Sequence, residues 1–159
     1  MVRALTADAD DDPRHADLAR RGCPVSAVRS RLRASGLRPT RQRILLGWML
    51  FAKGDRHVTA ESLYDEAHKA KVGLSLATVY NTLRQFTEAG LLRQVLTSAG
   101  KAYFDTNTSD HHHFLIQGED VMMDVPADEV QVSQLPEPPP GYVLDGVEVI
   151  VRLKRVGRR

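Results

Sequence analysis

The chain has 159 residues, a formal net charge of +2 and 42% hydrophobic residues, which is enough for one sizeable domain or two small ones. No apolar run approaches the roughly 20 residues that a membrane-spanning helix needs, and the N-terminus lacks an apolar signal region, so we expect a cytoplasmic protein. The single cysteine, Cys23, excludes an internal disulfide and a paired-cysteine zinc site.

Charge divides the chain into two halves. Residues 14–94 carry 15 Lys and Arg against 6 Asp and Glu, whereas residues 95–151 carry 1 against 10. A basic half favours a polyanionic partner, and an acidic half favours cations or self-assembly. Residues 1–14 are acidic, and we expect them to be disordered.

Two short helices are predicted first. Val25, Val28 and Leu32 are spaced for an amphipathic helix that Gly36 ends. Thr40 is then expected to cap a helix that runs to about Ala52. The predicted buried side of this second helix consists of Ile44, Leu45, Trp48 and Phe51.

A third helix is expected after Thr59. Thr59 is placed as its N-cap, and Glu61 lies in the first turn, where a negative charge is favourable. Gly73 is expected to close this helix. Its apolar stripe is predicted to be Ala60, Leu63, Tyr64 and Ala67.

The stretch from Ser75 to Leu92 is the most informative part of the sequence. It predicts a helix that Ser75 caps and Gly90 ends. Its apolar stripe is Leu76, Val79, Leu83 and Phe86, and its other face carries Thr78, Tyr80, Asn81, Arg84 and Gln85. The second set contains side chains that read base edges and phosphates.

A hairpin is predicted after this helix. Residues 91–96 and 101–104 read as strands, and residues 97–100 read as the turn between them. Three helices followed by a hairpin make a winged helix, so residues 15–105 are expected to form a DNA-binding domain. The alternative is a small helical domain with a solvated arginine face.

The second half favours strands. Residues 110–125 form short apolar segments around Gly118, Glu119 and Asp120, and residues 135–141 are a proline-rich connector. Residues 147–153 alternate as a strand in which Ile150 indicates burial on both faces. We therefore assign residues 106–155 to a second domain and residues 156–159 to a basic tail.

Three consecutive histidines stand at the start of this second domain. In an extended strand, His111 and His113 share one face and His112 takes the other, so one ion cannot easily collect all three. Two imidazoles with the carboxylates of Asp105 or Asp124 would suit Zn, Mn or Fe. The alternative is a polar strand end with solvated histidines.

Four stretches of the chain together resemble one known family. They read LRPTRQRILL, HVTAESLYDEA, SLATVYNTLRQFTEAGLL and GKAYFDTNTSDHHHFLI. In order and spacing they resemble the ferric uptake regulator (Fur) superfamily over roughly residues 23–155. The absence of CxxC pairs, with LPEPPPGY and EVIVRLKR, makes the chain most similar to the iron response regulator (Irr) branch.

This resemblance implies an α+β fold with two parts. They are an N-terminal winged-helix DNA-binding domain and a small C-terminal α/β dimerisation domain. It also implies a homodimer that binds a pseudo-palindromic double-stranded DNA operator, with Tyr80 and Asn81 on bases and Arg38 near the minor groove. The residues themselves further predict Arg41 and Arg43 as phosphate contacts. Thr78 and Arg84 are predicted DNA contacts on the helix within residues 75–92.

The resemblance also implies a regulatory site for a divalent metal between the domains. Its ligands would be His57, Asp105, His112 and Asp124, while Phe114 stands where the family has a further histidine. A third family site would use His111, but His113 replaces its acidic partner. The four-cysteine zinc site of the family is absent.

In the iron response regulator branch the effector is haem, or iron sensed through haem. The candidate haem ligands here are His111, His112 and His113, and Cys23 in a Cys-Pro pair. The resulting hypothesis is a regulator, mainly a repressor, of iron- and haem-related genes that is active under iron limitation and switched off by haem. The alternatives are a manganese, zinc, iron or peroxide sensor of the same superfamily, or a haem carrier or metalloenzyme. No enzyme motif is present, so we expect no catalytic activity.

Overall fold

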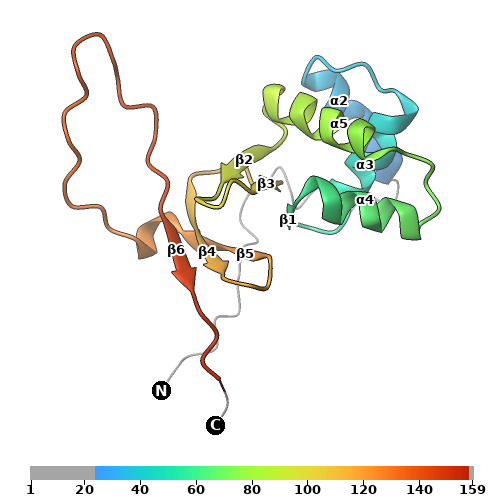
Figure 1. The fold of residues 1–159 in the computed structure, drawn as a ribbon. Coiled ribbons are helices and arrows are strands. Elements are labelled where there is room, and N and C mark those ends of the chain that lie inside the picture. Colours follow the sequence, from blue (N-terminus) through green and yellow to red (C-terminus); the bar gives the residue numbers. More distant parts are fainter. Residues whose placement is uncertain (1–23, 158–159) are drawn as a thin grey trace. The chain divides into compact units, whose positions relative to one another are not determined.

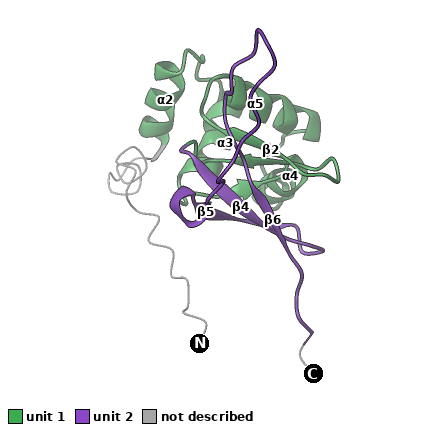
Figure 2. Cartoon of the chain, turned by 90° about the vertical axis from the view of Figure 1, so that its left-hand side faces the viewer, with its two compact units in different colours: residues 1–108 green, residues 109–159 purple. Residues whose placement is uncertain are grey.

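The structure of the protein is a computed structural model that describes residues 24–157. The chain divides into two compact units, residues 1–108 and 109–159 (Figure 2); the expected boundary after residue 105 lies within the first. The expectations for residues 1–14 and for Cys23 lie outside the described residues.

The first unit is a winged helix (Figure 1). Its elements are α2 (Pro24–Ala34), α3 (Arg41–Phe51), β1 (His57–Val58), α4 (Ala60–Lys69), α5 (Leu76–Glu88), β2 (Arg93–Leu96) and β3 (Ala102–Asp105). The strands form an antiparallel sheet in the order β1-β3-β2, and β2 and β3 make the expected hairpin. Strand β1 was not predicted, because two residues are too few to show a periodicity.

The three predicted N-caps are confirmed. The side chains of Thr40, Thr59 and Ser75 each accept a hydrogen bond from the backbone N–H three residues later. The side chain of Ser62 in turn accepts a bond from the N–H of Thr59, which completes a capping box at the start of α4. These local bonds fix where each helix begins.

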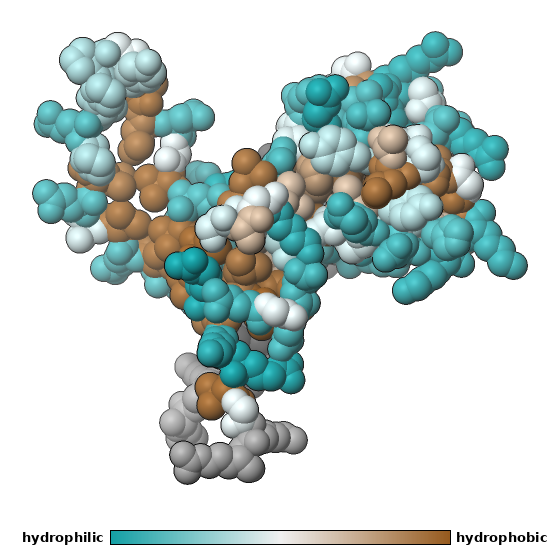
Figure 3. Space-filling model, in the orientation of Figure 1, coloured by the Kyte–Doolittle hydropathy of each residue, from teal (hydrophilic) through white to brown (hydrophobic). Residues whose placement is uncertain are grey.

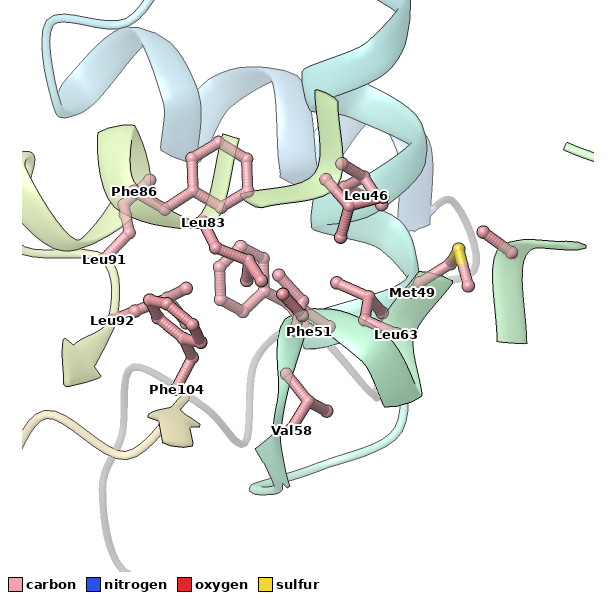
Figure 4. Packing of buried hydrophobic residues seen from close by; sticks show 14 of the residues in the cluster. Leu46, Met49, Phe51, Val58, Leu63, Leu83, Phe86, Leu91, Leu92 and Phe104 are labelled. Atoms are coloured by element: carbon pink, nitrogen blue, oxygen red, sulfur yellow. The ribbon is translucent and has the colours of Figure 1, made fainter. Parts of the chain in front are cut away.

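The core of the first unit lies between the helices and the sheet (Figure 4). The rings of Phe51 on α3 and Phe86 on α5 stack with their centroids 6.1 Å apart. In the stripe of α5, Val79, Leu83 and Phe86 are fully buried, as predicted. Leu76 is 42% exposed, so its predicted burial was wrong; it is the first residue of the helix.

The predicted buried face of α3 was wrong. Trp48 is 40% exposed, and Ile44 and Leu45 are only partly buried. The buried residues are Leu46, Gly47, Met49, Leu50 and Phe51. This helix is apolar almost all round, so periodicity alone could not choose a face.

The contact with α2 decides which face of α3 is buried. A Cβ on Gly47 would lie 2.7 Å from Cγ1 of Val28, so only glycine permits this close approach. On α2, Val28 and Leu32 are buried as predicted, but Val25 is 41% exposed, against the prediction.

Helix α4 ends differently from the prediction. It stops at Lys69, and Lys71 rather than Gly73 takes the left-handed backbone conformation, with φ +56°. The N–H of Lys71 donates to the His68 carbonyl and the N–H of Val72 donates to the Ala67 carbonyl, which is the Schellman arrangement. Gly90 occupies the equivalent position after α5, with φ +72°.

The second unit is a three-stranded sheet. Its elements are β4 (His111–Ile116), β5 (Val121–Pro126), the 3-10 turn η1 (Ala127–Glu129) and β6 (Ile150–Leu153). The order is β5-β4-β6, with β4 antiparallel to β5 and parallel to β6. Among the described residues of this unit, η1 is the only helical element.

A long segment without regular structure, residues 130–149, joins η1 to β6 (Figure 1). It contains the proline-rich connector 135–141, as expected. Strand β6 is shorter than predicted, because it begins at Ile150. The expected burial on both of its faces was wrong, since Val151 and Leu153 are exposed on this edge strand.

No helix in the described part of the chain is both long and apolar enough to cross a membrane.

We predict that Lys71→Gly stabilises the protein. Glycine adopts a positive φ without the steric cost that lysine incurs, so the free energy of unfolding should rise by about 0.5–1 kcal/mol in urea denaturation. Gly90→Ala is the matched control and should lower it by about 1 kcal/mol. Gly73 has no such φ and open space around it, so a loss of stability in Gly73→Ala with none in Gly90→Ala would contradict this assignment.

Candidate nucleic-acid interface and metal centre

The outer face of α5 is polar and open to solvent. Tyr80, Asn81 and Arg84 are exposed because they lie opposite the buried stripe of the helix. Arg84 forms only a loose ion pair, with Nε 3.6 Å from Glu88 Oε1. These side chains are available to a ligand, as the sequence predicted.

The predicted DNA-contacting arginines fall into two groups. Arg38 and Arg41 are exposed at the start of α3. Arg43 instead bonds within the protein: Nε and Nη2 donate to Gln85 Oε1 over 3.1 and 3.0 Å, and Nη1 donates to the Arg38 carbonyl over 2.9 Å. Its role as a phosphate contact stays a prediction.

Thr78 is also engaged within the protein. Its backbone N–H donates to Ser75 Oγ over 3.1 Å, and its Oγ1 lies 2.9 Å from the same Oγ. Thr78 therefore takes part in the N-cap of α5, and its contact with DNA stays a prediction.

A shallow hollow lies between the start of α3 and the outer face of α5. Its volume is about 240 Å³. Its lining consists of Thr40, Gln42, Arg43, Thr78, Asn81, Thr82 and Gln85. All of these side chains can form hydrogen bonds, so the hollow suits a polar ligand group.

The first unit contributes one pair of possible metal ligands. His57 on β1 and Asp105 on β3 are direct partners in the strand register, and His57 Nε2 lies 3.4 Å from Asp105 Oδ2. Asp105 is fully buried, and its Oδ1 accepts a bond from the N–H of Asn107 over 2.8 Å. One carboxylate oxygen is thus held by the backbone while the other faces the imidazole.

An ion pair next to His57 holds the start of β1. Arg56 Nη2 donates to Glu66 Oε2 over 2.7 Å, and Nη1 donates to the Met49 carbonyl over 3.0 Å. The bond from Arg56, aided by Lys53, holds the pKa of the Glu66 carboxyl below its usual range against the opposing effect of burial. This network ties β1 to α3 and α4 and so fixes where His57 lies.

The second unit brings together three candidate ligands of its own. His111 and His113 project from the same face of β4, and their Nε2 atoms lie 2.9 Å apart. Asp124, the register partner of His113 on β5, places Oδ1 3.4 Å from His111 Nε2. Ligands held by one tetrahedral ion at about 2.0–2.1 Å lie roughly 3.3 Å apart, so these separations fit a single metal ion.

A hydrogen bond behind the ring of His111 and an acidic contact behind that of His113 support this assignment. His111 Nδ1 lies 2.8 Å from the Ser109 carbonyl, which can only accept, so Nδ1 carries a proton and Nε2 presents its lone pair. His113 Nδ1 faces Glu148 Oε1 at 3.5 Å, an ion-pair contact rather than a hydrogen bond. With a proton on both Nδ1 atoms, two Nε2 lone pairs and the Asp124 carboxylate would converge, an arrangement that a bound cation stabilises. A backbone or carboxylate partner behind the ring is typical of histidines that bind metals.

The expected metal ligand His112 lies apart from His111, His113 and Asp124. This ring lies on the opposite face of β4 from Asp124, and its Nδ1 accepts a bond from the N–H of Val149 over 3.3 Å. Nδ1 is then occupied, and Nε2 of the neutral ring carries the proton. The strand register places His113 beside Asp124, so the role of His112 as a metal ligand stays a prediction. Phe114, which stands where the resemblance implies a ligand, pairs with Met123 and Val151 instead.

Sequence reasoning missed Glu148 as a site residue, and it missed the bond between Gln85 and Arg43. Glu148 reaches His113 only because β6 pairs with β4 in parallel, a pairing that links residues 37 positions apart. Gln85 stood on the polar face of α5, but nothing in the sequence paired it with Arg43. Of the proposed haem ligands, His111, His112 and His113 are buried, and Cys23 lies outside the described residues.

Comparisons with known proteins place this arrangement in context. Residues 34–135 match the ferric uptake regulator family. The chain is 41% identical over 88 residues to the ferric uptake regulation protein of Bordetella parapertussis and 37% identical over 87 residues to that of Pseudomonas aeruginosa. Each match covers 55% of this chain, but only 63% and 65% of the respective relatives, which is less than two thirds of their length.

A solved structure extends the similarity. The ferric uptake regulator from Pseudomonas aeruginosa, determined with manganese, superposes with a TM-score of 0.61 and 26% identity. The superposition covers 80% of this chain and 97% of that one. The resemblance therefore includes both the winged helix and part of the second unit.

We predict that Asp124→Asn and His113→Ala each weaken the binding of Zn²⁺ or Mn²⁺ to the full chain by at least about tenfold, because each removes a ligand atom. Isothermal titration calorimetry on metal-stripped protein measures this. His112→Asn is the control and should change the affinity less than about twofold. If His112→Asn loses metal affinity and His113→Ala does not, the ligand is His112, as the sequence analysis expected, and not His113.

Proposed function

Because this chain belongs to the ferric uptake regulator family, we propose that it is a metal-responsive transcription regulator that binds double-stranded DNA as a homodimer. The observation that supports this most directly is the solvent-exposed face of α5, opposite a fully buried stripe, on a basic winged helix. Arginines would supply salt-dependent affinity, and Tyr80, Asn81 and Arg84 would select the sequence. A helix of this kind reads the major groove.

A second copy of the chain would supply the other reading helix. One face of the sheet in the second unit is apolar and largely open: Val121, Met123, Val151 and Leu153 are all exposed. Tyr142, Val143 and Leu144 in the segment 130–149 are exposed as well, and Figure 3 shows hydrophobic side chains gathered there. A two-fold interface needs such a patch on each copy, which supports a dimer that matches two operator half-sites.

A divalent metal ion would act as the effector. His111, His113 and Asp124 would hold it, and a bound ion would supply the positive charge that their converging lone pairs and carboxylate require. The expectation that His57 and Asp105 share one ion with residues of the second unit stays a prediction. Iron, manganese and zinc all suit imidazole and carboxylate ligands, so the metal content of the protein as purified decides between them.

We also propose the finer function suggested by the resemblance to the iron response regulator branch. In it the protein represses iron- and haem-related genes under iron limitation, and haem lowers its affinity for DNA through the histidines of β4. The support is chemical: imidazole is a common axial ligand of haem iron. The rival function is a manganese, zinc or peroxide sensor, which would bind metal but not respond to haem.

The effector is tested by measuring affinity for a duplex selected from a randomised pool, with metal-stripped protein, with each metal, and with haem. We expect a metal to change the affinity by about tenfold or more and haem to weaken it. A change in affinity with a metal but not with haem would support the metal sensor and refute the haem switch. Equal affinity under all conditions would refute an effector role for either.

We predict that Arg41→Ala lowers the slope of log affinity against log salt concentration by about one unit, because one phosphate contact is lost. Fluorescence anisotropy on the selected duplex at several salt concentrations measures the slope. Arg152→Ala, an exposed arginine of the second unit, is the control and should leave it unchanged. If Arg41→Ala leaves the slope as it is, Arg41 does not contact phosphate.

A further inference from the structure

The side-chain amide of Gln85 is held in one orientation. Arg43 donates two N–H groups to its Oε1, over 3.1 and 3.0 Å, and a third to the Arg38 carbonyl over 2.9 Å. A guanidinium can only donate, so the atom that it faces must be the amide oxygen. Both acceptor positions of that oxygen are then filled, and the NH₂ group points away from Arg43.

Gln85 also lines the hollow beside the exposed face of α5. We call this face, which carries Tyr80, Asn81 and Arg84, the reading face. Gln85 lies one turn after Asn81 on α5, and both line the 240 Å³ hollow beside Thr40 and Gln42. Among the described residues, none accepts a hydrogen bond from Gln85 Nε2. The face that we assign to DNA thus presents two N–H donors in a fixed direction.

We propose that Gln85 contacts DNA purely as a hydrogen-bond donor, and that Arg43 is the positioning residue that enforces this. The proposal rests on the proposed DNA binding. A free glutamine reads adenine with both ends of its amide, accepting from N6 and donating to N7. With its oxygen occupied by Arg43, Gln85 cannot read adenine in this way and selects a group that only accepts.

Two kinds of acceptor on DNA meet this requirement. One is a base acceptor in the major groove, either the O6 and N7 edge of guanine or O4 of thymine, and the other is a phosphate oxygen. Both need the donor direction that Arg43 fixes. Arg43 would then act on DNA through Gln85 rather than through a phosphate contact of its own.

The experiment compares the wild type, Gln85→Met, Arg43→Met and the double variant on a pool of duplexes with a randomised central region. If the acceptor is a base, the wild type prefers guanine or thymine at one position of each half-site, Arg43→Met also accepts adenine there, and Gln85→Met loses the preference. If it is a phosphate, Gln85→Met loses about tenfold in affinity on every sequence and keeps its base preferences.

In either supporting case the double variant binds no worse than Gln85→Met alone, because Arg43 acts through Gln85. Gln117→Met, at an exposed glutamine in the turn after β4 of the second unit, makes the same substitution away from this hollow and should stay within twofold of the wild type. Thermal unfolding checks that each variant folds. Gln85→Glu keeps the Arg43 contact but removes both donors, so it tests the proposal even if Arg43→Met unfolds. Gln117→Glu, in the second unit, is the control for added charge.

The proposal is overturned if Gln85→Met and Gln85→Glu bind as their controls do. It is also overturned if Arg43→Met lowers the salt slope by about one unit and adds its full loss to that of Gln85→Met, since Arg43 would then contact phosphate directly. If the wild type itself binds no duplex at low salt, the proposed function fails instead, and the two failures are distinguishable.

Discussion

The burial of one stripe of α5 is the constraint on which the rest of the first unit depends. Val79, Leu83 and Phe86 have no exposed surface, and burying side chains of this size stabilises by about 1.5–3 kcal/mol each. Because successive residues of a helix turn by 100°, fixing these three also fixes what faces solvent. The reading face is therefore a consequence of the core: it cannot rotate without exposing the stripe.

In strand β4, too, the backbone geometry decides which side chains share a face, because successive side chains of a strand alternate between its two faces. Its pairing with β5 places His111, His113 and Asp124 on one face and His112 on the other. The three histidines thus separate into a pair that converges on a carboxylate and one that bonds to the backbone of Val149. A one-residue shift of register would exchange these roles and turn the apolar side chains of β4 to the opposite face.

The sequence was informative where local chemistry decides the structure and misleading where packing does. Thr40, Thr59 and Ser75 could be assigned as caps because each acts on a neighbour three residues away. The buried face of α3 could not be found, since nearly every side chain of that helix is apolar and the choice rests on its contact with α2. The end of α4 was also misplaced. The left-handed conformation that glycine favours is adopted there by Lys71 and not by Gly73, so the position of a glycine did not mark the end of the helix. At the candidate sites the residue types were foreseen, but the bonds of Arg43 to Gln85 and the approach of Glu148 to His113 join residues 42 and 35 positions apart, which no periodicity reports.

The close approach of α2 and α3 also restricts how this protein can change over time. With only 2.7 Å between a Cβ on Gly47 and Val28 Cγ1, a larger residue at position 47 is tolerated only after position 28 has become smaller. Shortening Val28 first leaves a small cavity, which costs about 1 kcal/mol, whereas enlarging Gly47 first drives its Cβ against the Val28 side chain, so that this side chain or the helix must shift. The order of substitutions therefore matters, and this pair is a site of epistasis at which drift can proceed along one route but not the other.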